Sequence, residues 1–123
     1  MKVTYEQIVE AMAGLSKVSD IRRAPATSRK LFQLRVTLGN SFDFYSEEEQ
    51  KLVEELGGKV AENGLILFAD PAKKREYAER RKELLKMEED VPMEKKIQIR
   101  DAELKEISGE EMWALRHFVD FTE

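Results

Sequence analysis

The chain of 123 residues contains no cysteine and a single histidine, His117. The lack of cysteine excludes disulfides, thiol catalysis and thiolate metal sites. One imidazole also excludes any metal site that needs two or more histidines. No stretch reaches the roughly 20 apolar residues that a membrane-spanning helix requires, and the first residues lack the apolar run of a signal peptide. We therefore expect a soluble cytoplasmic domain without a cofactor or a membrane partner.

An excess of basic charge is also missing. The formal net charge is −4, whereas nucleic-acid binding needs a concentrated basic surface to neutralise phosphates. Charged residues nevertheless make up 37% of the chain, against about a quarter in ordinary globular domains. The apolar share of 41% is sufficient for a core. This combination is typical of long amphipathic helices with solvated outer faces, and the length predicts a single domain over 1–123.

The sharpest local pattern is Asn63-Gly64, which lies between β-prone residues. Asn and Gly tolerate the positive φ angles of a type I′ turn, so the dipeptide predicts a β-hairpin over 59–68. A helix is expected on each side of it. Asp70-Pro71 is a favoured helix start, and the following helix is expected over 71–89. The two helices would form a long helical hairpin that the β-hairpin joins.

The helix before the β-hairpin is expected over 28–56 and ends at two glycines. Its apolar residues recur every three or four positions, as a buried face requires: Leu31, Leu34, Leu38, Phe42, Tyr45, Leu52, Val53 and Leu56. Two other interpretations stay open. The weak triplet Gly39-Asn40-Ser41 would bend or break the helix near 39–46, and residues 32–38 alternate as a strand would. We favour one long helix.

The ends of the chain add two amphipathic helices and a strand. Thr4 and Gln7 form a capping box that begins a helix over 5–15. Alternation over 95–100 predicts a strand that could extend the β-hairpin to three strands. A further capping box begins a final helix over 109–120. The fold class is therefore α+β and mostly helical, with a small antiparallel sheet of two or three strands.

Candidate chemistry is sparse. The carboxylate runs at 47–49 and 88–90 do not converge on one ion, because consecutive helical residues point about 100° apart. His117 lacks a positioned nucleophile, so a structural role is favoured for it. We therefore expect no catalytic, metal or cofactor site. The least neutralised basic residues are weak candidates for anion contacts: Arg22, Arg23, Arg29 and Lys30.

Aromatic and leucine side chains exceed what slender helices can bury. The surplus predicts a contact surface for a second copy of the chain or for another protein. The residues expected in that interface are Phe44, Tyr45, Leu52, Leu56, Trp113 and Phe118.

The order of these pieces resembles a known family. Glu-Glu-Glu-Gln-Lys-Leu at 47–52 is followed by Gly-Gly-Lys-Val at 57–60 and Glu-Asn-Gly at 62–64, and later by a Glu-rich helix and a short strand. This pattern is similar to a family of small uncharacterised proteins encoded by phages and prophages of Gram-positive bacteria. The resemblance implies a non-enzymatic structural or assembly protein, in the host cell or the virion, that binds itself or another phage protein. The alternative is a small regulatory protein that binds nucleic acid or host machinery.

Overall fold

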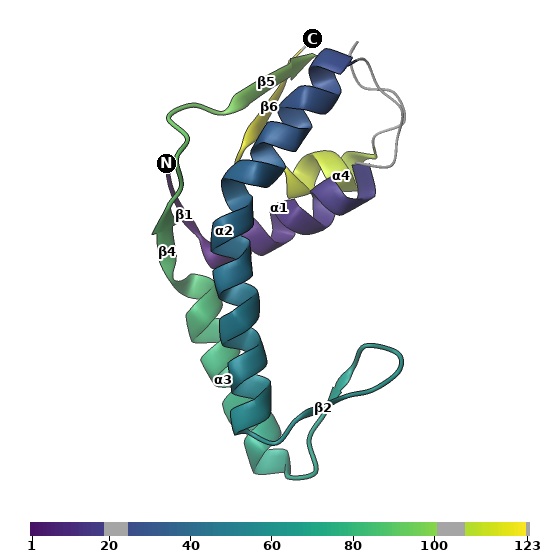
Figure 1. Cartoon of the computed structure of the whole chain (residues 1–123), viewed down its shortest axis with the longest axis vertical. Coiled ribbons are helices and arrows are strands. Elements are labelled where there is room, and N and C mark those ends of the chain that lie inside the picture. Colours follow the sequence, from purple (N-terminus) through teal and green to yellow (C-terminus); the bar gives the residue numbers. More distant parts are fainter. Residues whose placement is uncertain (19–24, 101–107, 123) are drawn as a thin grey trace.

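The computed structural model describes residues 1–18, 25–100 and 108–122, and Figure 1 shows their arrangement. The elements are β1 (Lys2–Thr4), α1 (Tyr5–Val18), α2 (Pro25–Glu55), β2 (Lys59–Val60), β3 (Ile66–Leu67), α3 (Pro71–Lys86), β4 (Glu88–Asp90), β5 (Ile97–Arg100), α4 (Gly109–Ala114) and β6 (Val119–Thr122). The described strands form three separate two-stranded sheets. The expected class, α+β and mostly helical, is confirmed.

The long helix α2 contacts α1, α3 and β5, whereas α4 packs against α1 (Figure 1). Helix α2 is continuous over Pro25–Glu55, so a break near 39–46 and a strand over 32–38 are both excluded. Its buried stripe continues past the glycine triplet, from Leu38 to Tyr45, and packing of that stripe compensates for the poor helix propensity there. The helix ends at Glu55, and Gly57 just beyond it has a φ of 72°, which suits a residue without a side chain.

Helix α3 packs on the C-terminal half of α2, which confirms the helical hairpin (Figure 1). Two ion pairs connect the helices. The Arg80 guanidinium lies 3.1 Å from the Glu55 carboxylate, and the Arg81 guanidinium lies 3.0 Å from the Glu49 carboxylate. The expected end of α3 at 89 is wrong. The helix stops at Lys86 because the next residues form β4, which pairs antiparallel with β1.

The start of α3 depends on a single side chain. The Asp70 carboxylate accepts a hydrogen bond from the backbone N–H of Ala72 at 2.9 Å. We expect Asp70→Ala to lower the free energy of unfolding by about 1 kcal/mol, because that N–H loses its partner. Urea unfolding followed by circular dichroism measures this difference. The control Glu79→Ala, on the exposed face of α3, should change it by less than about 0.5 kcal/mol; equal effects would contradict the capping role.

The C-terminal region differs most from its expected form. The helix predicted over 109–120 ends at Ala114, and Val119–Thr122 is a strand, β6. This strand pairs in parallel with β5, with Ile97 opposite Val119. The strand predicted over 95–100 therefore begins at Ile97 and does not extend the β-hairpin. Pairing with β6 leaves Ile99 and Val119 almost fully buried, which continuation of α4 into this region would not allow.

The core lies where α1 crosses the N-terminal half of α2, next to α4 and the β5–β6 sheet (Figure 1). Helix α1 contributes Ile8, Ala11 and Leu15, all buried. Its predicted capping box is present, since Gln7 N–H donates to the Thr4 hydroxyl at 3.3 Å and Thr4 N–H donates to the Gln7 side-chain oxygen at 3.0 Å. The helix continues to residue 18, three residues beyond its expected end.

Candidate protein interface

The β-hairpin projects away from the two helices that it connects (Figure 1). Gly64 N–H donates to the Ala61 carbonyl at 2.9 Å, and Ala61 N–H donates to the Leu65 carbonyl at 2.8 Å. The loop therefore has three residues, 62–64, with Gly64 at a φ of 84°. A type I turn followed by a left-handed glycine explains this geometry. The expected hairpin is confirmed, whereas the type I′ turn is wrong.

We call residues 59–67 the arm. Its side chains are absent from the buried core cluster of the described residues. Three apolar side chains are instead largely exposed: Val60 by 68%, Leu65 by 61% and Leu67 by 58%. The arm is anchored at its base, where the ring of Phe68 lies 5.1 Å from that of Tyr77. It therefore presents apolar groups to solvent on a fixed support.

Both faces of the arm are apolar. The antiparallel register places Lys59 opposite Leu67 and Val60 opposite Ile66. Because opposed residues share a face and alternate residues of a strand do the same, Leu65 and Leu67 lie on one face. Val60 and Ile66 lie on the other. A two-stranded ribbon cannot bury either face by itself.

Four of the six residues expected at an interface are instead buried within the fold of the single chain. Tyr45 and Leu52 are buried on the stripe of α2, Leu56 is buried just beyond the end of α2, and Phe118 is fully buried between α4 and β6. Their regular helical spacing predicted a buried face. It did not show whether that face is covered by the same chain or by another chain. The structure shows that the helices of the same chain cover them.

The other two expected residues reach the surface at separate places. Phe44 is 44% exposed, and its ring centre lies 5.8 Å from that of Tyr5. Trp113 is 65% exposed, and the guanidinium of Arg116 lies 3.9 Å above its ring centre. They belong to α2 and α4 respectively. These two side chains are available for contacts, apart from the arm.

The anion-contact candidates do not form a described site. Arg22 and Arg23 lie outside the described residues. Arg29 is exposed near the start of α2, whereas the Lys30 ammonium donates to the Gln98 carbonyl at 2.9 Å. Lys30 therefore links α2 to β5.

Two tyrosine hydroxyls donate to carboxylates inside the fold. Tyr45 donates to Glu49, which also accepts from Arg81, and Tyr5 donates to Glu89 on β4. Burial, the hydrogen bond and the charge of Glu89 raise the pKa of Tyr5 to about 12. Burial, together with the hydrogen bond to Glu49 and its charge, raises the pKa of Tyr45. These polar side chains stabilise the packing of elements that are distant in the sequence.

The raised tyrosine pKa values predict a loss of stability at alkaline pH. The pKa of Tyr5 is 10.0 for the free side chain and about 12 in the fold. Its contribution is complete below pH 10 and disappears between pH 10 and 12, because the unfolded chain ionises first. We expect the free energy of unfolding to fall by on the order of 1–2 kcal/mol from this residue over that range. Urea unfolding at successive pH values measures it.

Tyr5→Phe is the comparison for this measurement. The variant lacks the ionisable group, so its stability should fall less between pH 10 and 12, although Tyr45 still contributes. At pH 8 it should be less stable than the unmodified chain by about 1 kcal/mol because it lacks the hydrogen bond to Glu89. Identical pH profiles for the two chains would contradict the account.

His117 has the surroundings of a structural side chain. Its Nδ1 atom lies 3.4 Å from the side-chain amide nitrogen, Nε2, of Gln7. Burial and the charge of Arg116 lower the pKa of His117, although Glu10 acts in the opposite direction. Within residues 1–18, 25–100 and 108–122, no three His, Asp or Glu side chains are grouped so that they could hold a metal ion. The lowered pKa favours the neutral imidazole, which contacts Gln7 of α1.

The sequence contained one signal for the arm that its interpretation missed. Leu65-Ile66-Leu67-Phe68 are four consecutive apolar residues. Alternate residues of a strand point to opposite faces, so one supporting surface cannot cover all four. A similar argument applies to Phe32 and Val36, which lie off the buried stripe of α2 and are exposed. Both sets become visible only when the apolar residues outside each buried face are considered.

Comparison with known proteins adds no assignment. No family model matches the chain, and neither a curated protein nor a solved structure matches it significantly. Across the described part of the chain, no helix has the length and apolar character to cross a membrane. The exposed apolar surfaces are therefore the features of the fold that point to a function.

Proposed function

We propose that this chain is a non-enzymatic structural or assembly protein that associates with copies of itself through the arm. The observation that carries the proposal is the exposure of Val60, Leu65 and Leu67 on a ribbon outside the core. Full burial of such side chains gains about 1.5–3 kcal/mol each. Covering the arm would therefore supply several kcal/mol toward association, before the entropic cost of binding is subtracted.

The backbone of the arm supports the same proposal. Strands β2 and β3 pair only with each other among the described strands, so each has an outer edge with unpaired N–H and C=O groups. Natural proteins usually protect such edges, and an isolated hairpin is marginal in water. A partner that covers the arm would satisfy its edges and its apolar faces together.

The phage or prophage origin in this proposal rests on the resemblance in turns and apolar spacing. An assembly role agrees with the use of the polar side chains, because Tyr5, Tyr45 and Arg81 are engaged in contacts within the fold. Exposed apolar groups on a projecting ribbon are unfavourable in the single chain. Covering the ribbon in an assembly would remove that unfavourable exposure.

Co-purification of two differently tagged copies tests the proposal. The copies are produced together, treated with nuclease and captured through one tag in high salt. We expect the second copy to be retained, because an apolar contact is not weakened by the screening of charges. Loss of the second copy in high salt or after nuclease treatment would overturn the proposal. A nuclease-dependent complex would favour the alternative of a nucleic-acid-binding regulator.

A further inference from the structure

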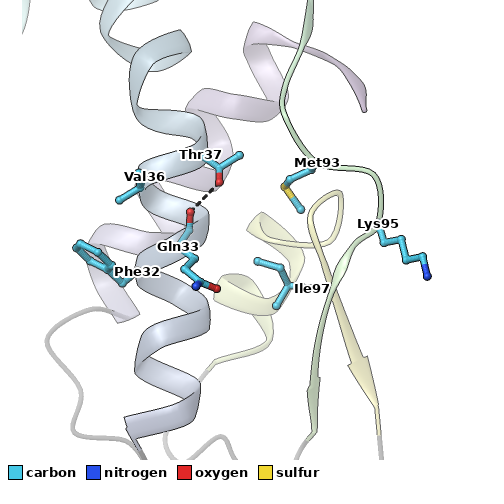
Figure 2. A pocket seen from close by; sticks show the side chains of 7 residues that line it. All are labelled: Phe32, Gln33, Val36, Thr37, Met93, Lys95 and Ile97. Atoms are coloured by element: carbon cyan, nitrogen blue, oxygen red, sulfur yellow. Dashed lines mark hydrogen bonds between the residues drawn. The ribbon is translucent and has the colours of Figure 1, made fainter.

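Two hollows beside α2 differ in the chemistry of their walls. The larger one, of about 440 Å³, lies between α2 and the extended chain at residues 93–97. Figure 2 shows its one charged side chain, Lys95, extending outward from the wall, and Phe32 and Val36 pointing away from Met93 and Ile97. This hollow therefore brings no charged group toward a ligand. The smaller hollow does.

The smaller hollow combines a carboxylate with an aromatic ring. Its volume is about 280 Å³, and three elements line it: α1 with Tyr5, α2 with Asn40, Ser41 and Phe44, and β4 with Glu89. Figure 1 shows the β1–β4 pair beside the middle of α2, where these residues meet. Sites for drug-sized ligands have about 300–1,000 Å³, so this volume suits a small molecule. We call this hollow the Glu89 pocket.

Glu89 carries a negative charge that no described cation neutralises. The side chain is partly buried and accepts a hydrogen bond from the Tyr5 hydroxyl, which is a neutral donor. Its neighbour Glu88 differs, because the Lys2 ammonium lies 3.5 Å from that carboxylate. Within residues 1–18, 25–100 and 108–122, no ion pair includes Glu89. A partly buried carboxylate without a cation is unfavourable, so the Glu89 pocket favours a positively charged ligand.

The ring of Phe44 supplies a second feature that attracts a cation. It is 44% exposed, and the buried ring of Tyr5 lies 5.8 Å from it between centroids. A positive charge within about 6 Å of an aromatic ring is attracted by the negative face of that ring. Asn40 and Ser41 add side-chain oxygens that accept hydrogen bonds. An alkylammonium group carries the charge and donates several hydrogen bonds, so it matches these surroundings.

The residues of α2 at the Glu89 pocket are explained neither by helix formation nor by packing. Gly39, Asn40 and Ser41 are poor helix formers in the middle of a long helix. A Cβ at Gly39 would meet no atom within 4 Å, and its φ is not positive, so neither contacts nor backbone geometry require glycine there. Asn40 and Ser41 line the pocket and lie outside the core cluster. A binding role accounts for these two polar residues.

We propose that the Glu89 pocket binds a small primary amine in its ammonium form. The ammonium donates to Oε1 of Glu89, the carboxylate oxygen that the tyrosine does not contact, and to the side-chain oxygens of Asn40 and Ser41. The alkyl chain lies on the ring of Phe44. Because the pocket joins β4 to α2, the bound amine stabilises that contact. The pocket lies apart from the arm, so this inference is independent of self-association.

Titration of the full-length chain with butylammonium, followed by nuclear magnetic resonance, tests the proposal. In about 0.15 M salt, which screens contacts with exposed charges, we expect a dissociation constant on the order of 1 mM. The largest shifts are expected at Asn40, Phe44 and Glu89. Butanol lacks the charge and should bind about tenfold more weakly; tetramethylammonium lacks N–H donors and should bind about threefold more weakly. Equal binding of either probe, or shifts centred elsewhere, would overturn the proposal.

Glu89→Gln removes the charge and retains an acceptor for the Tyr5 hydroxyl. It should weaken butylammonium binding by about tenfold, because a hydrogen bond to a charged group becomes a neutral one. The matched control, Glu88→Gln, removes the same charge from the opposite face of β4 and should change binding by less than about twofold. Equal effects of the two variants would overturn the proposal, because long-range charge would then explain them.

Asn40→Ala separates binding from folding. Alanine is the better helix former, so this variant should be at least as stable as the unmodified chain in urea, yet bind butylammonium about threefold more weakly. Unchanged binding would remove Asn40 from the site and overturn the proposed set of acceptors. This variant also decides the question if Glu89→Gln does not fold.

A primary ammonium group can belong to a free amine or to a lysine side chain of a protein. Putrescine represents the first source, and N-acetyl-lysine amide represents the second. The probe that binds more tightly identifies the source, and sensitivity of its binding to Glu89→Gln supports the ammonium site. Absence of binding by both probes would overturn the proposal.

Discussion

Replacing Leu65 and Leu67 with Asp is expected to produce a folded monomer. Both side chains are more than half exposed and lie outside the core, so the free energy of unfolding of the single chain should change by less than about 1 kcal/mol in total. In an assembly the same positions are buried against apolar groups, where an unpaired carboxylate is costly. We expect self-association to weaken by about 100-fold or more, as for central residues of an interface.

The measurement for this variant is the mass in solution over a range of concentrations, together with urea unfolding. A matched control changes Gln50 and Ala78 to Glu, which adds the same negative charge on exposed positions of α2 and α3. The control should assemble as the unmodified chain does. If both variants lose assembly equally, general charge repulsion explains the effect and the arm is not the contact. If the arm variant assembles normally, the contact lies elsewhere.

Phe118→Ala is expected to cause the largest loss of stability. Phe118 is fully buried, its N–H donates to the Leu115 carbonyl at 3.0 Å, and its carbonyl accepts from Ile97 N–H at 2.9 Å. Removing a buried phenyl ring costs about 3–5 kcal/mol, which is a large part of the total stability of a small domain. The ring fills the space where α4 ends and β6 begins, so its loss should loosen the β5–β6 sheet as well.

Urea unfolding of Phe118→Ala should be compared with that of Trp113→Ala. Trp113 belongs to α4 in the same region but is 65% exposed, and its visible partner is the guanidinium of Arg116. Its replacement should cost less than about 1 kcal/mol. A stable Phe118→Ala variant that fails to assemble would contradict the burial of this ring and restore it as an interface residue.

The local patterns of the sequence predicted the helical hairpin well. Asp70-Pro71 and Gly57 are signals that act within one helical turn, and both mark helix ends in the structure. The stripe from Leu31 to Leu52 also predicted a buried face correctly. Such signals depend on neighbouring residues alone, which is why a single sequence contains them.

The pairing of distant segments could not be predicted in the same way. Strands β1 and β4 have three residues each and pair across more than eighty positions, so neither is long enough to show alternation. Leu115 and Val119 are four residues apart, so their spacing also fits a helix. In the structure, however, α4 ends at Ala114 and Val119 begins strand β6. Parallel pairing with β5 decided the outcome, and this contact is non-local.

The sequence indicated a surplus of apolar side chains but did not show which of them are exposed. The excess of apolar side chains suggested a contact surface, and exposed apolar residues are present on the arm and on the outer side of α2. The residues chosen for it were mostly those with regular helical spacing, which the fold uses for its own packing. The informative residues were those left over after each buried face was assigned, such as Phe32 on α2 and Leu65 on the arm.

The most direct test of self-association is the mass of the unmodified chain, measured by light scattering during size exclusion at low and high salt. The single chain has a mass of 14.3 kDa. We predict at least twice this value at both salt concentrations, because burial of the apolar arm does not depend on charge. A mass of one chain at protein concentrations up to about 100 µM, far above a typical specific dissociation constant, would contradict the account.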